Sequence, residues 1–211
     1  MNIIGCDEVN FSPSLCGDCV VCCLYNLRDK VDGVKDSKKL THKQRIELFR
    51  ELRKSTIYSI SLATPSMIDY VNIYHARNNA IISSAMSLAQ TLGQMNKRMD
   101  GLEVWIDGKW SEKKMKEFEI ITSLRFKGIQ NGDDTVYEIS AASIVAKVCV
   151  DALFRGFMDF YPQQGIGLDH GVLTKVHKEE LREKGLSPYH RGGVYAKNWW
   201  NKILGDNSGR Y

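Results

Sequence analysis

The chain has 211 residues, of which 43% are hydrophobic and 26% charged, and its formal net charge is +4. This composition is typical of a globular protein with one large domain, and the mildly basic charge permits a polyanionic partner without requiring one. No apolar run is long enough to span a bilayer, and the N-terminus lacks a secretory signal pattern, so we expect a cytoplasmic monomer with no membrane partner.

The first predicted element is a short buried strand in which Ile3, Ile4 and Cys6 lead into the adjacent carboxylates of Asp7 and Glu8. Two anions beside a dry core are costly unless a cation, hydrogen bonds or a raised pKa offsets their charge. The pair is therefore either part of a site or a solvated turn that follows the strand.

Five of the six cysteines lie between Cys6 and Cys23. The spacing of Cys16, Cys19 and Cys22 resembles a metal site, but no second such pair and no histidine pair follows at zinc-finger distance. The same stretch has the pattern of a buried strand. We therefore expect reduced cysteines that act as small hydrophobic residues.

Apolar periodicity and capping signals predict the remaining elements. In chain order they are a strand at 19–26, a helix at 42–54 capped by Thr41, a strand at 57–62, a short helix from Thr64, a helix at 73–95, a strand at 103–107, a short helix at 111–118, a strand at 120–126, a loop at 130–134 and helices at 139–161 and 174–184. This order predicts an α/β fold with a mixed β-sheet flanked by helices.

Acidic residues follow two of the predicted strands, at Asp7-Glu8 and at Asp107, and Asp133 precedes a buried helix. Strand ends and loops meet where sites form, so these carboxylates are expected to converge. Divalent cations relieve the repulsion in such a cluster, and oxygen-only ligands favour Mg²⁺ or Mn²⁺. Two such ions are the device that hydrolyses phosphodiesters.

Ser143, Lys147 and Asp151 are spaced four residues apart and share one face of the predicted helix at 139–161. They form either a polar stripe that meets water or a set of side chains that supports the acids and a phosphate.

Several short motifs together resemble type 2 ribonuclease H (ribonuclease HII) in their order and approximate spacing. They are Gly5-Cys6-Asp7-Glu8, residues 36–40, Ile68-Asp69 with Asn72-Ile73, Ile106-Asp107-Gly108, residues 140–148, Thr174-Lys175 with His177, and His190-Arg191. The resemblance covers residues 2 to about 191, which is nearly the whole chain.

The resemblance implies an RNase H-like fold in one domain over residues 1–211, with about 162–211 as a C-terminal helical extension. It also implies an endoribonuclease that hydrolyses the RNA strand of RNA–DNA hybrids with two metal ions, Mg²⁺ or Mn²⁺. The catalytic and metal-binding residues carried over are Asp7, Glu8, Asp107 and Asp133, with the adjacent Asp134 as a rival for the fourth position. The residues expected to bind substrate are Asn10, Phe11, Ser12, Lys39, Ser143, Lys147, Thr174 and Arg191.

The chain departs from the family at two places that read the junction between RNA and DNA. Residues 9–13 are Val-Asn-Phe-Ser-Pro where the family has Ala-Gly-Arg-Gly-Pro, and Val172 stands where the family has a stacking tyrosine. Phe11 and Tyr189 are candidates to replace that ring. We therefore expect retained chemistry with weakened specificity for a single ribonucleotide. Val9 and Gly33-Val34-Lys35 are also similar to type 3 ribonuclease H.

Two alternatives remain for function, and two for the tail. The chain could instead be a nuclease of the same fold that cuts structured DNA, or a nucleic-acid-binding protein with little turnover. His190, Arg191, Lys197 and Trp199 are either a basic, aromatic rim that grips nucleic acid, or Trp199 and Trp200 cap the core.

Overall fold

A five-stranded sheet forms the centre of the computed structural model, which describes residues 2–11, 15–160 and 174–204. The strands are β1 (Ile3–Val9), β2 (Cys19–Asn26), β3 (Thr56–Ala63), β4 (Glu103–Asp107) and β5 (Arg125–Ile129). Their spatial order is β3-β2-β1-β4-β5, so β1 is the central strand. The first three strands pair antiparallel, whereas β4 and β5 run parallel to β1. The sheet is therefore mixed, as predicted.

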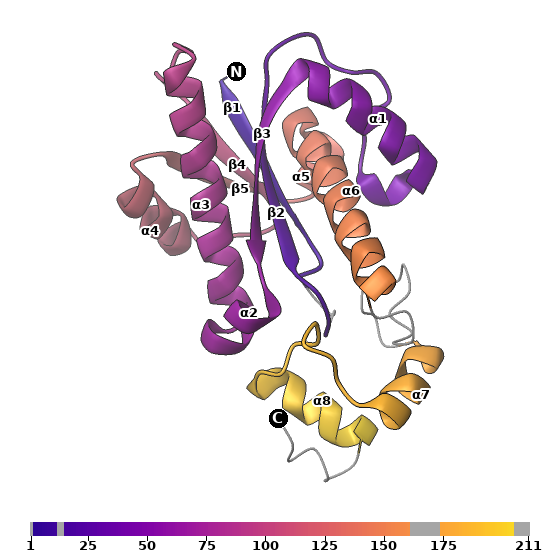
Figure 1. Cartoon of the computed structure of the whole chain (residues 1–211). Coiled ribbons are helices and arrows are strands. Elements are labelled where there is room, and N and C mark those ends of the chain that lie inside the picture. Colours follow the sequence, from indigo (N-terminus) through magenta and orange to yellow (C-terminus); the bar gives the residue numbers. More distant parts are fainter. Residues whose placement is uncertain (1, 12–14, 161–173, 205–211) are drawn as a thin grey trace.

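Helices cover both faces of this sheet (Figure 1). α3 (Ile73–Gln94) and α4 (Glu112–Thr122) pack on one face, and α1 (His42–Ser55) and α6 (Tyr137–Phe160) pack on the other. The shorter elements are η1 (Ser37–Lys39), α2 (Pro65–Val71) and α5 (Gly132–Thr135). Thr41 caps α1 through a capping box with Gln44, which agrees with the predicted start of that helix.

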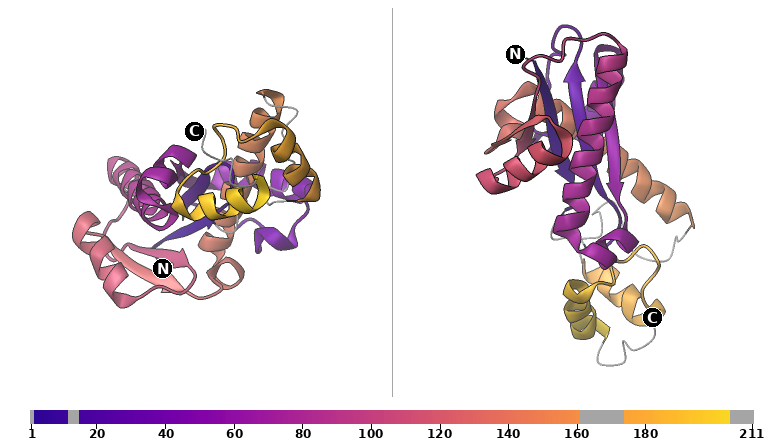
Figure 2. Two further views of the ribbon diagram at one scale, coloured as in Figure 1. Left: turned by 90° about the horizontal axis from the view of Figure 1, so that it is seen from below. Right: turned by 90° about the vertical axis from the view of Figure 1, so that its left-hand side faces the viewer.

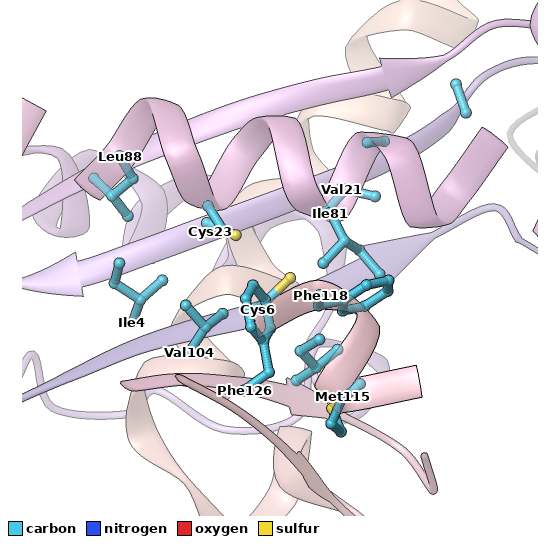
Figure 3. Packing of buried hydrophobic residues seen from close by; sticks show 14 of the residues in the cluster. Ile4, Cys6, Val21, Cys23, Ile81, Leu88, Val104, Met115, Phe118 and Phe126 are labelled. Atoms are coloured by element: carbon cyan, nitrogen blue, oxygen red, sulfur yellow. The ribbon is translucent and has the colours of Figure 1, made fainter. Parts of the chain in front are cut away.

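The central strand is buried on both sides, which explains its run of small and apolar residues. Figure 3 shows Ile4 and Cys6 packed with Cys23, Val104 and Ile81 between the sheet and α3. Gly5 faces the other way, where the first turn of α6 crosses the strand. All six cysteines are free thiols and five are buried, so the prediction of reduced, core-forming cysteines is confirmed.

The C-terminal extension has a small core of its own. In the right-hand view of Figure 2, α7 (Lys175–Lys184) and α8 (Val194–Leu204) lie beyond one end of the sheet. Leu15, Leu181 and Trp200 pack between them, and the Trp200 indole donates to the backbone oxygen of Arg191. The two oxygens of Asp69 in α2 accept hydrogen bonds from the backbone nitrogens of Gly192 and Gly193, at 2.8 and 2.7 Å. These bonds fix the extension to the main body.

Two of the four residues of the possible basic rim are buried in the C-terminal extension. His190 and Arg191 are 5% and 4% exposed, so neither side chain presents charge to a ligand. His190 instead lies 3.0 Å from His177 between their Nε2 atoms, and burial, followed by His177, lowers the pKa of His190 to about 3. Trp200 caps the small core, Lys197 is exposed, and the Trp199 side chain lies outside the described part of the structure.

The structure differs from the sequence prediction at three places. Residues 120–122 complete α4 rather than beginning a strand, and Ser123 ends the helix in a left-handed conformation before β5 starts at Arg125. The predicted loop at 130–134 contains the short helix α5, and α8 was not predicted as a separate helix. Among the described residues, no helix is both long and apolar enough to cross a membrane.

We expect Gly5→Ala to lower the free energy of unfolding by about 3 kcal/mol, because the added methyl group would overlap the backbone of Glu138 and Ile139. Gly156→Ala is the matched control, since nothing lies within 4 Å of a methyl group there and alanine favours helix; it should stabilise by about 0.5–1 kcal/mol. Urea unfolding measures both changes. Equal stabilities for the two variants would show that β1 and α6 are not in close contact.

Candidate active site

Acidic side chains converge where β1 and its parallel neighbour β4 end. Cys6 and Ile106 are in register, so Asp7 and Asp107 follow side by side at the carboxyl ends of the two strands. The Oδ1 atom of Asp107 accepts hydrogen bonds from the backbone nitrogens of Gly132, at 2.7 Å, and Asp133, at 3.2 Å. These bonds hold the start of α5 against β4 and bring Asp133 to the same edge of the sheet.

Burial and neighbouring carboxylates raise the pKa of Asp7 and of Glu8. Burial and then the charge of Glu8 raise the pKa of Asp7 well above its usual range, and a hydrogen bond with Ser143 only partly opposes this. Burial raises the pKa of Glu8 as well, although Arg77 opposes the rise, and the charge of Asp107 adds to the rise in both. The cluster therefore favours any added positive charge.

Two basic side chains already neutralise part of this charge. The Nζ atom of Lys38 lies 3.0 Å from Oδ2 of Asp133, and Nη1 of Arg77 lies 3.3 Å from Oε1 of Glu8. The second oxygen of Glu8, Oε2, is buried and has no hydrogen-bond partner among the residues that the structure describes. Sequence reasoning assigned a role to neither cation. Lys38 could have been chosen from its place beside Lys39, but nothing in the sequence near Arg77 indicates its pairing with Glu8.

These donors fit a divalent cation. Within the described ranges, no three histidine, cysteine, aspartate or glutamate side chains are already arranged to hold a metal ion. Instead, Lys38 and Arg77 draw Asp133 and Glu8 toward themselves. A cation would satisfy the orphaned Glu8 oxygen and relieve the mutual repulsion, and oxygen donors of this kind suit Mg²⁺ or Mn²⁺.

The two candidates for the fourth acid are in different environments. Asp133 is 7% exposed, its backbone nitrogen donates to Asp107 and its carboxylate pairs with Lys38, whereas the Asp134 side chain is 48% exposed and pairs with Lys39 on the surface. The geometry therefore favours Asp133 as the member of the cluster.

The polar stripe of α6 supports the acids from within the fold. Ser143 is buried, bonds to Asp7 and lies 2.8 Å from Ser37 between their hydroxyl oxygens, so it positions Asp7. Contact between Ser143 and a substrate stays a prediction. One turn further, Lys147 lies 3.5 Å from the buried carboxylate of Asp151, which also pairs with Arg45. Burial lowers the pKa of Lys147.

The segment after Glu8 is held by the C-terminal extension. Asn10 has a left-handed backbone with φ of 66°, and its side-chain amide donates to the backbone oxygens of Cys16 and Asp18. Arg191 donates to the backbone oxygens of Asn10, Phe11 and Gly17. Arg191 thus positions this segment, and its contact with substrate stays a prediction.

The structure describes two further residues that the sequence analysis singled out. Thr174 caps α7 by accepting a hydrogen bond from the backbone nitrogen of His177, and its predicted substrate contact stays a prediction. Tyr189 stacks on Phe157 with ring centroids 4.1 Å apart, and its hydroxyl donates to Asp18. Its ring therefore packs within the fold. Ser12 and Val172 lie outside the described residues.

We expect Arg191→Met to lower the free energy of unfolding by about 3 kcal/mol, because it removes charged hydrogen bonds to three backbone oxygens. The salt dependence of nucleic-acid binding should keep its slope, since the buried guanidinium releases no counterion. Lys197→Met, at an exposed position, is the control and should change stability by less than about 0.5 kcal/mol. A flatter slope for Arg191→Met would mean that Arg191 reaches a phosphate.

Curated proteins resemble this chain in sequence over most of its length. A family model described as ribonuclease HII matches residues 4–202. The ribonuclease HII of Alkaliphilus oremlandii is 36% identical over 205 residues, which cover 96% of this chain and 92% of that protein. The ribonuclease HII of Rickettsia bellii is 33% identical over 190 residues, covering 90% and 87%.

Solved structures share the fold at lower identity. Ribonuclease H2 from Pyrococcus horikoshii has a TM-score of 0.77 at 22% identity, over 98% of this chain and 100% of that one. A Bst-RNase HIII structure in complex with Mn²⁺ has a TM-score of 0.71 at 14% identity, over 97% and 70%. The sheet and its flanking helices are therefore an RNase H-like fold, as the sequence predicted.

Proposed function

The chain belongs to the ribonuclease HII family, and from this premise we propose that it is a divalent-metal-dependent endoribonuclease that hydrolyses the RNA strand of RNA–DNA hybrids. One observation carries the proposal. Carboxylates from segments far apart in the sequence, at Asp7-Glu8, Asp107 and Asp133, meet at one edge of the sheet, where burial and mutual repulsion give them a need for cations.

Neighbouring groups position these acids for a role as metal ligands in phosphodiester hydrolysis. Divalent cations bound here would activate a water molecule and stabilise the leaving oxygen. Ser143 holds Asp7, Arg77 holds Glu8, and Asp107 fixes the turn that carries Asp133. These contacts fix the segments that carry the acids, and a metal ion would draw their oxygens together.

Positively charged side chains near the acids suit a polyanionic backbone. The side chains of Lys38 and Lys39 are 79% and 53% exposed, and both pair with aspartates beside the cluster. A bound phosphate can compete for these exposed pairs, because each contributes little to stability in water. We propose that Lys38, Lys39 and Lys147 face the substrate backbone.

We also propose that junction specificity is weaker than in typical family members. Asn10 keeps a left-handed backbone that glycine would adopt freely, but its side chain is used for bonds to Cys16 and Asp18. The segment therefore has a backbone conformation that glycine could also adopt at position 10, but with asparagine there it carries a larger side chain near the site. That bulk is expected to hinder close approach of the backbone to a ribose hydroxyl.

Asp107→Asn should abolish hydrolysis of a uniform hybrid, by about a thousandfold or more, because it removes a charged ligand. The fold should persist, since asparagine retains the oxygen that accepts from Gly132 and Asp133. Cleavage with Mg²⁺ or Mn²⁺ and thermal unfolding in EDTA measure the two effects, and Asp134→Asn is the matched control with activity retained. Turnover by Asp107→Asn at the wild-type rate would refute the catalytic assignment.

The wild-type protein on the same substrates distinguishes the alternative functions. Faster cleavage of a matched DNA duplex than of the hybrid would favour a DNA nuclease. Binding of the hybrid without cleavage would favour a nucleic-acid-binding protein.

We expect faster cleavage of a duplex with an all-RNA strand than of the same duplex with one ribonucleotide, by about tenfold. The reason is that the four acids need only a held phosphate, whereas the single-ribonucleotide substrate also needs a reader of the ribose hydroxyl. Initial rates on the two duplexes of identical sequence measure the ratio. Equal or better cleavage of the single-ribonucleotide duplex would show that another segment reads the junction.

A further inference from the structure

An aromatic cluster adjoins the acidic edge, and its rings have no role in the hydrolysis described above. It consists of Phe11 after β1, Tyr74 and Arg77 on α3, and Trp110 after β4; we call these four residues the ring cluster. The Arg77 guanidinium carbon lies 4.3 Å from the centre of the Phe11 ring and 4.4 Å from that of Trp110. The cation is thus held between two rings.

The ring cluster is tied directly to two of the acids. Arg77 pairs with the Glu8 carboxylate, and the Trp110 indole nitrogen donates to the backbone oxygen of Asp107 at 2.8 Å. The rings therefore have a fixed position relative to the carboxylates, and a ligand that contacts them is placed relative to the metal ligands.

Tyr74 forms the exposed rim of the cluster. Its ring meets Phe11 edge to face, with centroids 5.3 Å apart and planes at 78°, yet the residue is 63% exposed. Exposed aromatic residues are ordinary on protein surfaces, and Tyr70, which is 90% exposed on the preceding helix α2, is an example. Tyr74 differs because Phe11 and Arg77 hold its ring beside the acids. An oriented, solvent-facing ring suits stacking on another flat group.

We propose that Phe11 and Tyr74, backed by Arg77, form a stacking subsite for one nucleotide of the bound strand beside the acidic cluster. The chemistry is that of sequence-tolerant nucleic-acid recognition, in which aromatic faces take up bases next to a positively charged group. The subsite rests on the proposed function for its ligand class, since the acids beside it act on a phosphodiester. It supplies a platform in a chain where Tyr189 is committed to the fold.

The test is equilibrium binding of a labelled RNA–DNA hybrid in EDTA, where cleavage does not occur, at several salt concentrations. Tyr74→Ala should weaken binding about tenfold at every salt concentration. The slope of affinity against salt should stay unchanged, because stacking releases no phosphate counterion. Tyr74→Phe keeps the ring and should bind within about twofold of wild type.

Tyr70→Ala is the matched control, because it removes an equally large exposed ring outside the cluster, and it should bind as wild type does. Thermal unfolding of each variant should match wild type, since neither tyrosine is buried. Wild-type affinity for Tyr74→Ala, or equal losses for both alanine variants, would overturn the subsite. A flattened salt slope for Tyr74→Ala would also overturn it. Failure of the wild-type protein to cut any hybrid with Mg²⁺ or Mn²⁺ would instead refute the proposed function, and a selective binding loss in Tyr74→Ala would still support the subsite.

Discussion

The burial of two adjacent carboxylates at the end of the central strand is the constraint on which the rest of the site depends. Asp7 is 6% exposed, and burial is the largest cause of the raised pKa of both Asp7 and Glu8. An isolated buried carboxylate costs several kcal/mol, so the surrounding structure has to offset it. Ser143 and Arg77 are two such offsets, which reach the acids from α6 and from α3. The cation of the proposed function would be a third.

The sequence predicted the elements whose signals are local. β4 at Glu103–Asp107 and β2 at Cys19–Asn26 have the predicted bounds, because apolar runs, alternation and caps depend on neighbouring residues. The prediction failed at 120–126, where apolar residues that look like a strand complete α4, and two of them, Ile120 and Ile121, are exposed. Local patterns cannot show which apolar residues tertiary packing leaves outside.

The acids could be chosen from sequence, but several residues around them could not. Arg191 carries a charge next to a histidine and was expected to bind substrate, yet it is buried and bonds to backbone oxygens more than 170 residues away in sequence. Arg77 lies in a helix with no motif to mark it and reaches Glu8 only because α3 packs on β1. Such pairings are set by the fold, so composition and spacing do not reveal them. The left-handed Asn10 is intermediate, since asparagine is among the residues that tolerate that conformation.

The two cations at the site differ in how easily they can give way. The Lys38 side chain is 79% exposed, so it can swing into solvent, but the Asp133 carboxylate it pairs with is buried and needs another cation in its place. The Arg77 side chain is 13% exposed and held between Phe11 and Trp110, so moving it means breaking ring contacts as well as the bond to Glu8. On the proposed function, a metal ion would replace Lys38 at Asp133 and would leave Arg77 in place at Glu8. Such an exchange keeps the buried Asp133 carboxylate paired with a positive charge, while Arg77 keeps Glu8 and the ring cluster in a constant geometry.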